Sequence, residues 1–306
     1  MTHADWPVRP MEPVSSESVI DEDDTLYQVK WDGVRVLAYI EESGVRLFNR
    51  NLRERTRQYP ELVEQLSALD GDTVLDGEII ALNEYGKPDF PRVLERDLAR
   101  AVQPGSQFIA SRPVYYMVFD VLWYRGENLC DRPLTERLGV LDSLGFDEGS
   151  LIHRVESVPG AGTALFAAVK SEELEGIVSK KKDSPYRIGK KSELWRKVKC
   201  FRHITALVGG YRTQDDRIRS LLLGIPREEG LLCVGAASTG ISGRQWESLR
   251  VLLPKINAPC PFVNPPMMDG VRWVQPVLPV RVRFLEYTSR GNMRAPVITG
   301  FPEGIP

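Results

Sequence analysis

The pattern of apolar residues changes near Cys200, and this change constrains the fold more than any other feature. Before it, stretches with apolar residues at helical spacing alternate with short runs of strand type. After it, short strand-like runs follow one another between Gly-rich turns, with one expected helix at 244–253. The expected strands of this part are 203–211, 220–226, 231–237 and 280–287. The last third therefore predicts a small Greek-key β-barrel of about 100 residues.

The first two thirds predict an α+β domain, in which helices and antiparallel strands are mixed along the chain. Strands are expected at 26–30, 34–40, 45–48, 74–82, 114–123 and 176–180. Helices are expected at 60–69, 91–101, 133–144 and 163–174. Because 306 residues are enough for two domains, we expect one domain over 1–199 and a second over 203–306.

The composition excludes several classes of protein. The chain is 42% hydrophobic and 27% charged, which excludes disordered and fibrous proteins. No apolar run approaches the roughly 18 residues of a membrane span, and the first residues lack the pattern of a signal peptide. The four cysteines are scattered and the three histidines are not grouped, which argues against a disulfide framework and a His-rich metal site. We therefore expect reduced thiols, a cytoplasmic location and no membrane partner.

Positive charge is concentrated in the last part of the chain. Residues 187–306 contain 19 Lys and Arg against 9 Asp and Glu, although the whole chain has a net charge of −2. A basic region on a nearly neutral chain is typical of a protein that contacts a polyanion from that side. A plain solvated surface is the alternative, which composition alone does not remove.

A lysine at the end of an apolar strand is the first candidate for chemistry. Lys30 comes just before the turn Asp32-Gly33. A lysine amine is a nucleophile only in its uncharged form, which burial or neighbouring cations favour. Candidates for such cations are Arg35, Arg50, Lys197 and Lys199. Taken alone, a strand-end lysine is more often a solvated rim residue, so Lys30 needs support from other elements.

Carboxylates occur within or just before two other apolar strands. One group is Asp76-Gly77-Glu78, which interrupts the strand expected at 74–82, and the other is Glu175 before the strand at 176–180. Mg²⁺ prefers oxygen ligands and keeps several of its waters, so two such carboxylates suit it. Each carboxylate taken singly is more often satisfied by the backbone N–H groups of a turn.

Two lysines alternate with an aliphatic residue in a later strand. The strand period of two places Lys197 and Lys199 on one face and Val198 on the other. Neighbouring cations repel each other unless an anion lies between them, and a polyphosphate is a natural anion for this position. Phe119, inside the expected strand 114–123, is either a core residue or a ring that stacks on a purine, with Val178 covering the other face of the base.

Together and in this order, these elements are far more specific than any one of them. They are Lys30-Trp31-Asp32-Gly33 with Arg35, Phe48-Asn49-Arg50-Asn51, Asp76-Gly77-Glu78, Val118-Phe119-Asp120-Val121-Leu122, Glu175-Gly176-Ile177-Val178-Ser179-Lys180 and Trp195-Arg196-Lys197-Val198-Lys199. The series resembles the covalent nucleotidyltransferase superfamily, and most closely its ATP-dependent DNA ligases of the bacterial end-joining, Ku-associated type. The resemblance covers about residues 8–200 and continues into 206–211 and 284–288, which are similar to the OB-fold domain of those ligases.

The resemblance implies that Lys30 attacks the α-phosphorus of ATP, releases pyrophosphate and keeps AMP on its side chain. It further implies that Phe119 stacks on adenine, that Glu78 binds the ribose or a metal, and that Glu175 helps to hold the metal, Mg²⁺ or Mn²⁺. The full set of residues expected to bind the nucleotide is Gln28, Val29, Arg35, Arg50, Glu78, Phe119, Val178, Lys191, Lys197 and Lys199.

In the same resemblance, the cations handle the phosphates. Arg35 and Arg50 hold the phosphates or the ribose and later the 5′-phosphate of DNA, whereas Lys197 and Lys199 neutralise the α-phosphate with Lys191 as a helper. AMP then passes to the 5′-phosphate at a nick, and the 3′-hydroxyl displaces it. The implied partners are nicked or broken double-stranded DNA and a Ku-like end-binding protein, in the nucleoid of a bacterial cytoplasm.

Two departures from the family pattern stand out. The residue two positions before the lysine is Gln28, where many members carry glutamate, and the chain ends without the basic element (R-x-D-K-like) that orients pyrophosphate in the family. Arg290 and Arg294 lie nearby but are not assigned to that role. The alternatives are an RNA ligase or capping-type guanylyltransferase, and a non-catalytic module that binds DNA ends.

Overall fold

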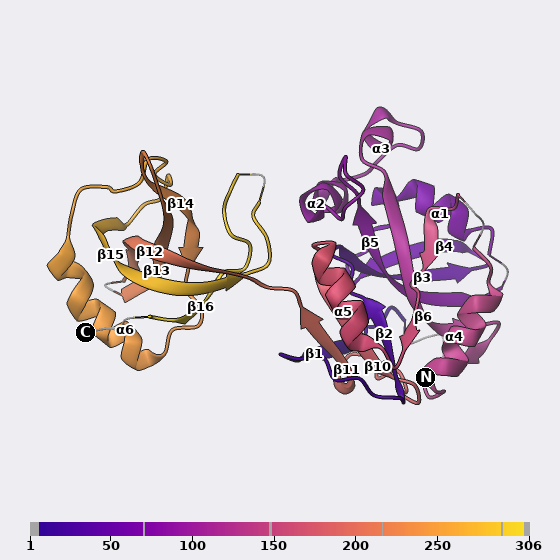
Figure 1. Ribbon diagram of the computed structural model, residues 1–306. Helices are drawn as coiled ribbons and strands as arrows, with labels where there is room; N and C mark the ends of the chain where they lie inside the picture. The colour runs from indigo at the N-terminus through magenta and orange to yellow at the C-terminus, as the bar shows by residue number, and fades with distance from the viewer. Residues whose placement is uncertain (1–5, 70, 147–148, 216, 289, 303–306) are drawn as a thin grey trace. The chain divides into compact units, whose positions relative to one another are not determined.

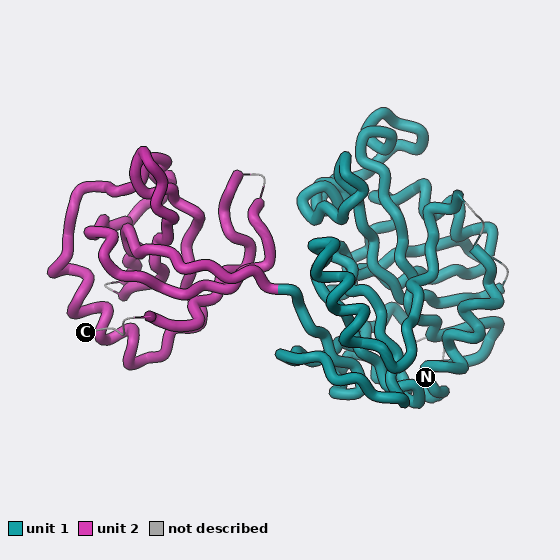
Figure 2. The backbone as a smooth tube through the Cα atoms, in the orientation of Figure 1, with its two compact units in different colours: residues 1–200 teal, residues 201–306 magenta. Residues whose placement is uncertain are grey.

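The computed structural model describes residues 6–302, apart from residues 70, 147–148, 216 and 289. The chain forms two compact units, residues 1–200 and residues 201–306, which Figure 2 shows in different colours. Within the described part of the chain, none of the helices combines the length and the apolar character that crossing a membrane requires. Each unit is described by itself.

Unit 1 contains helices and strands in the mixed order expected for an α+β domain. Its strands are β1 (Glu12–Ser15), β2 (Thr25–Val29), β3 (Val34–Glu41), β4 (Gly44–Asn49), β5 (Thr73–Ala81), β6 (Val114–Tyr124), β7 (Glu127–Asn128), β8 (Ile152–Arg154), β9 (Val158–Pro159), β10 (Gly176–Lys181) and β11 (Lys191–Lys199). Its helices are η2 (Thr56–Gln58), α1 (Pro60–Leu66), α2 (Phe90–Leu98), α3 (Gln107–Ser111), α4 (Leu134–Ser143) and α5 (Gly162–Ser171). Every helix and strand predicted for this unit is present, with ends that differ by a few residues.

Two sheets make up unit 1 (Figure 1). The first has the strand order β4-β3-β5-β6-β7, with β8 paired to β6. The second has the order β1-β11-β10-β2-β9, and α5 packs against its β2 and β10. Strand β1 was not predicted, because its partner β11 lies about 180 residues away in the sequence and their parallel pairing is not visible in local pattern.

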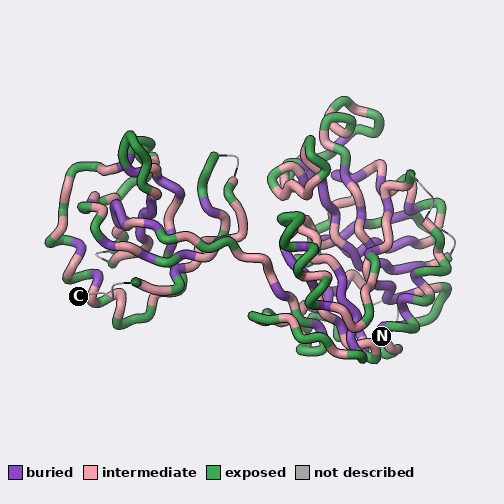
Figure 3. Tube along the Cα trace, viewed as in Figure 1, coloured by how far each residue is buried: buried purple, intermediate pink, exposed green. Residues whose placement is uncertain are grey.

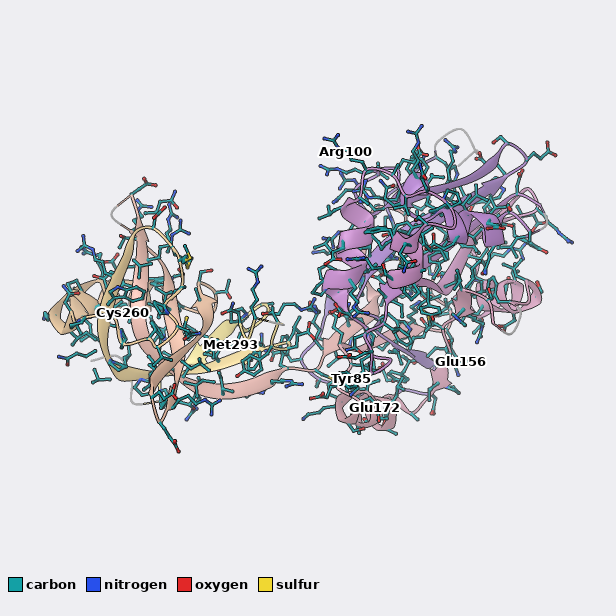
Figure 4. The ribbon with its side chains drawn as sticks, turned by 90° about the horizontal axis from the view of Figure 1, so that it is seen from above. Tyr85, Arg100, Glu156, Glu172, Cys260 and Met293 are labelled. Carbon is teal, nitrogen blue, oxygen red and sulfur yellow. The ribbon has the colours of Figure 1, made fainter. Side chains whose placement is uncertain are left out.

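The main core of unit 1 lies on the first sheet. Buried residues of β3, β5 and β6 join those of α1, α2 and α4 in one hydrophobic cluster, and Figure 3 shows buried segments running along these strands. A smaller cluster forms between α5 and the second sheet and includes Tyr27, Val169 and Ile177. The opposite face of the second sheet is mixed: Leu26 and Trp195 join the main core, and polar side chains such as Gln28 and Lys197 lie beside them.

One expectation for β5 was wrong. Asp76-Gly77-Glu78 does not interrupt the strand, which runs unbroken over Thr73–Ala81. The pairing with β6 shifts by one residue at this point, because Asp76 pairs with Asp120 and Gly77 with Val118. The extra residue is Phe119, so the bulge lies in β6 and β5 stays continuous. A side chain at Gly77 would meet the ring of Tyr116 at 2.6 Å, which explains the glycine at this point.

Unit 2 is a five-stranded antiparallel sheet that closes on itself. Its strands are β12 (Arg202–Gln214), β13 (Arg217–Arg227), β14 (Gly230–Ala237), β15 (Val271–Phe284) and β16 (Val297–Gly300), and its helices are α6 (Gly243–Leu252) and η3 (Leu253–Ile256). The sheet order is β14-β13-β12-β15-β16, and a bridge from Thr239 to Val297 joins the two edges. Ser242 and Gln245 cap the start of α6 reciprocally.

Strand β15 differs from its prediction. A strand was expected over 280–287, but β15 begins nine residues earlier and ends at Phe284. Pro276 and Pro279 do not favour a strand over residues 271–279, because proline has no backbone N–H to donate to a sheet ladder. The pairing of β15 with β12 skips from Trp273 to Leu278, so Pro276 lies in a bulge where no ladder hydrogen bond is needed.

Candidate active site

The second sheet of unit 1 brings predicted site residues from three strands into adjacent positions. Strands β2, β10 and β11 are neighbours, and their register aligns Gln28, Val178 and Lys197 in one row. Two residues further along the strand, Gly176 lies opposite Lys199, and the backbone N–H of Lys30 donates to Gly176 O at 2.8 Å. Because strand side chains alternate between faces, these residues share the face opposite α5.

Glu175 joins Lys30 to Lys199. One of its carboxylate oxygens is in direct contact with the Lys30 Nζ, and the other lies 2.6 Å from the Lys199 Nζ. Burial alone would raise the pKa of Glu175, but the charges of Lys30 and Lys199 outweigh it and lower the pKa below its usual value. The Lys30 side chain is 22% exposed, so it is not a solvated rim residue.

Lys197 adds a further cation to this cluster. Its pKa is lowered by burial and by the positive charges of Lys30 and Lys199. Lys191 lowers it further, whereas Glu12 raises it. An anion bound here would relieve this repulsion, so the cluster suits a phosphate.

Glu78 faces the same cluster from the first sheet. It lies opposite Arg35 in the pairing of β5 with β3. Burial raises the pKa of Glu78 to about 7, and it outweighs the lowering effect of Lys30 and Arg35. Glu175 raises this pKa too, so the two carboxylates are close enough to repel each other. A divalent cation fits such a pair, because it would stabilise both charges.

The metal site would therefore depend on two protein carboxylates. The described residues contain no group of three or more His, Cys, Asp or Glu side chains that could hold a metal ion. Mg²⁺ commonly uses only one or two carboxylates and takes its other oxygens from water and substrate phosphates. Glu78 and Glu175 would supply these two carboxylates.

Arg35 has a partner that the sequence analysis did not identify. Its guanidinium donates to both oxygens of Asp76, at 2.9 and 2.6 Å, and the Tyr186 hydroxyl donates to Asp76 at 2.6 Å. Asp76 is fully buried. Burial by itself would lower the pKa of Arg35, but Asp76 raises it above its usual value, so the arginine stays charged. Asp76 thus fixes the orientation of Arg35 at the edge of the site.

Phe119 lies on β6 and is only partly buried. Residues 115, 117 and 119 of this strand are partly exposed, whereas those between them are buried, so one face of β6 borders the site. The Arg35 guanidinium carbon is 5.1 Å from the centre of the Phe119 ring, and the Lys180 Nζ is 4.4 Å from it. Lys180 ends the motif that begins at Glu175, and the sequence predicts no role for it. Its spacing of two from Val178 was the signal that it shares this face.

Three other predicted residues lie outside the row of Gln28, Val178 and Lys197. The Val29 side chain packs in the α5 cluster on the opposite face, so a role in nucleotide binding would have to use its backbone. Arg50 and Lys191 line a cavity of about 410 Å³ together with Arg9, Glu12 and Lys190, and two of these residues, Lys191 and Glu12, are close enough to shift the pKa of Lys197. The segment around Arg9 and Glu12 forms one wall of this cavity. It is held to the turn before β11 by two backbone hydrogen bonds, from Gly189 N to Arg9 O at 2.8 Å and from Glu12 N to Lys190 O at 2.9 Å.

The C-terminal departure from the family pattern falls partly outside the described residues, since residues 303–306 are not among them. Arg294, one of the two arginines near that end, is ion-paired with Glu286 at 2.9 Å.

Comparison with known proteins decides the family. Residues 11–199 match the model of the ATP-dependent DNA ligase domain, and residues 214–303 match the model of the C-terminal region of ATP-dependent DNA ligases. The chain belongs to the ATP-dependent DNA ligase family. The two matches correspond to the two units of the structure.

Relatives of this ligase family member occur in several bacteria. The multifunctional non-homologous end joining protein LigD of Mycolicibacterium smegmatis is 34% identical over 297 residues, which cover 92% of this chain and 36% of LigD. The SPbeta prophage-derived DNA ligase-like protein LigB of Bacillus subtilis is 36% identical over 208 residues, which cover 68% of this chain and 73% of LigB. The chain therefore spans about a third of the length of its LigD relative.

Solved structures of ligase domains share the fold. The crystal structure of the ligase domain of LigD from M. tuberculosis aligns with a TM-score of 0.57 and 28% identity, over 96% of this chain and 94% of that one. A mycobacterial DNA ligase D complexed with ATP and MES aligns with a TM-score of 0.56 over the same shares of the two chains.

Proposed function

We propose that this protein is an ATP-dependent DNA ligase that seals nicks or broken ends in double-strand-break repair. The observation that carries the proposal is the contact of Lys30 with Glu175, which also binds Lys199, on a sheet face that carries Lys197. A nucleophilic amine, two carboxylates and several cations are what nucleotidyl transfer needs, because this chemistry depends on positioning and charge neutralisation.

In the first step, Lys30 Nζ bonds to the α-phosphorus of ATP, and the bond from that phosphorus to the pyrophosphate oxygen breaks. The amine has to lose a proton before it attacks the phosphorus. The contact with Glu175 holds the amine in place. Lys197 and Lys199 neutralise the α-phosphate while negative charge moves to the leaving group. In the later steps, AMP passes to the 5′-phosphate of DNA and the neighbouring 3′-hydroxyl displaces it.

The nucleobase lies between Phe119 and Val178 in this proposal. Gln28 is buried, and its amide nitrogen donates to Ser157 Oγ at 2.9 Å. That bond leaves the amide oxygen of Gln28 as the group offered to the amino group of adenine. Glutamine in place of the family's glutamate is therefore compatible with a preference for ATP.

The cavity lined by Arg9, Arg50, Lys190 and Lys191 supports a second phosphate site. These side chains come from the segment before β1, the end of β4 and the turn into β11. Four cations against the single carboxylate of Glu12 favour a phosphate group, such as the 5′-phosphate at a nick.

Mg²⁺ or Mn²⁺ would be held by Glu78 and Glu175. When bound, the metal would neutralise phosphate charge. Glu78 would then be ionised, because the cation offsets the burial that raises its pKa.

The DNA substrate and the setting of the reaction are part of the proposal. Nineteen of the 40 Lys and Arg residues fall in residues 187–306, which include all of unit 2, so we infer that this region contacts the phosphate backbone. The LigD relatives are named for non-homologous end joining, which supports a Ku-like partner and a place on the bacterial nucleoid for this chain as well.

A gel assay separates the proposal from its alternatives. Purified protein is incubated with a divalent metal, α-labelled ATP or GTP, and a duplex with a nick flanked by DNA or by RNA. We expect label from ATP alone on the protein and sealing of the DNA nick. Lys30→Ala should abolish both, whereas Lys170→Ala, an exposed lysine on α5, should change neither. Label from GTP, or sealing of the RNA nick alone, would favour the capping-type or RNA-ligase alternative; no label with retained DNA binding would favour the binding module.

A further inference from the structure

Lys180 is the buried cation nearest to the predicted base-stacking residue. It lies on β10 and is 2% exposed. Its Nζ is 4.4 Å from the centre of the Phe119 ring and 4.0 Å from that of Trp195, and it donates a hydrogen bond to the backbone oxygen of Phe119 at 3.4 Å. One amine therefore contacts both the ring and the backbone of Phe119.

The direct contacts of the Lys180 amine are two aromatic rings and a backbone oxygen. The charged groups that face it are Asp76 of β5, Asp120 of β6, Arg35 of β3 and Arg137 of α4. Each carboxylate is already paired through both oxygens with an arginine, Asp76 with Arg35 and Asp120 with Arg137. Within the described residues Lys180 forms no ion pair of its own. A buried ammonium in this position is expected only if the rings and a carbonyl stabilise it.

Trp195 gives Lys180 a rigid support. The indole N–H of Trp195 donates to Ser184 Oγ at 3.1 Å, and its ring packs edge-on against Tyr186 with centroids 5.8 Å apart. Trp195 is almost fully buried, whereas Phe119 is partly exposed. The buried amine of Lys180 thus lies between the fixed ring of Trp195 and the ring of Phe119, which borders the site.

We propose that Lys180 is a positioning residue for the nucleobase, whose amine holds the Phe119 ring so that its exposed part stacks on adenine. This inference rests on the proposed function, because it assumes that Phe119 meets the base. It assigns to Lys180 a role separate from that of the phosphate-binding lysines, since Lys180 acts through Phe119 and not on the phosphates.

The inference predicts a pH dependence with a definite sign. Burial lowers the pKa of Lys180 to about 7, although Asp120 and Asp76 oppose the effect. The charged form therefore predominates below about pH 7 and is lost as the pH rises through it. Because only the ammonium attracts a ring face strongly, nucleotide affinity should be higher at pH 6 than at pH 8.

The test compares Lys180→Met with Lys181→Met in the full chain. Methionine keeps the length of the side chain and its contact with the rings but removes the charge. Lys181 is the next residue, on the opposite face, and pairs with Asp24 at 2.7 Å on the surface. The probes are α,β-methylene-ATP, which has a base but cannot transfer AMP, and inorganic triphosphate, which has none. Their dissociation constants are measured by calorimetry at pH 6 and pH 8, together with the melting temperature.

We expect Lys180→Met to weaken binding of the nucleotide about tenfold at pH 6, to leave triphosphate binding unchanged and to melt no lower than wild type. Lys181→Met should bind both probes like wild type. In wild type, the ratio of the two affinities should fall about five- to tenfold from pH 6 to pH 8, and in Lys180→Met it should be flat. Both probes carry terminal phosphates that titrate in this range, so the ratio reduces that contribution, and the Lys180→Met series measured in the same buffers shows what remains of it.

Unchanged nucleotide affinity in Lys180→Met would overturn the inference, as would an equal loss for both probes, which would indicate general damage to the site. If Lys180→Met does not fold, the wild-type pH series decides by itself: a flat ratio contradicts the inference. Failure of the proposed function would appear differently, as wild-type protein that never becomes labelled with AMP.

Discussion

Replacing Asp76 by Asn should destabilise unit 1 far more than the same change at an exposed carboxylate. Asp76 is fully buried and accepts from Arg35 at 2.9 and 2.6 Å and from Tyr186 at 2.6 Å. Asparagine keeps the shape but removes the charge that balances Arg35. The guanidinium would then be a poorly solvated cation without a counter-ion.

The expected cost follows from these contacts. Removing one partner of a buried ion pair typically costs about 3–5 kcal/mol, because the other charge remains buried. For a unit of this size, each kcal/mol lowers the melting temperature by about 2–4 °C, so Asp76→Asn should melt about 6–20 °C lower. Arg35 would also lose its fixed orientation, so nucleotide binding should weaken at temperatures where the variant is folded.

Calorimetric melting of the full chain tests this prediction, with Asp131→Asn as the matched control. Asp131 also accepts from an arginine, Arg187, at 3.3 Å, but its side chain is 91% exposed. An exposed pair contributes little, so Asp131→Asn should melt within about 2 °C of wild type. Equal shifts for the two variants would refute the view that Asp76 neutralises and orients Arg35.

Three further outcomes are expected from the structure. Gly33→Ala should destabilise the protein by about 1–3 kcal/mol in urea unfolding, because a Cβ there would lie 2.1 Å from the Ile79 carbonyl oxygen. Gly139→Ala, in a helix with open space around it, should be neutral or stabilising. A larger loss of stability in Gly139→Ala than in Gly33→Ala would contradict the packing. Phe119→Leu should weaken α,β-methylene-ATP binding about tenfold or more. Phe108 is also a partly exposed ring covered by arginines, and Phe108→Leu should leave this binding unchanged. Equal effects of the two variants would exclude base stacking. Binding of nicked DNA, followed by fluorescence anisotropy, should fall steeply between 50 and 200 mM salt, as is typical of about 6–10 phosphate contacts, and a flat response would remove the polyanion argument.

The face of the second sheet was predictable because it depends on local periodicity. A spacing of two placed Lys197 and Lys199 together, and the structure confirms that they lie on one face. The helices of unit 1 follow from apolar spacing in the same way. Periodicity does not show which strands pair. The family resemblance placed Lys30 and Glu175 in one site, but the contact between them is a finding of the structure.

The supporting residues were not predictable for the same physical reason. Asp76 and Tyr186 are 110 residues apart, and the amine of Lys180 reaches a ring on another sheet. Such contacts depend on how the two sheets pack. Asp76 was instead grouped with Glu78 in one acidic motif. The two are alternate residues of β5 and share a face, so the pattern alone does not show that Asp76 pairs with Arg35 and Tyr186. The bulge at Phe119 of β6, opposite Asp76 and Gly77, is likewise not visible in the sequence pattern.

Mapping the covalent adduct tests the central claim most directly. The protein is incubated with ATP and Mg²⁺, digested at neutral pH and analysed by mass spectrometry. The account predicts a single AMP, lost in acid, on the peptide that contains Lys30, and no AMP on Lys30→Ala, which should still bind nicked DNA. AMP attached to any other residue, or a labelled Lys30→Ala, would contradict it.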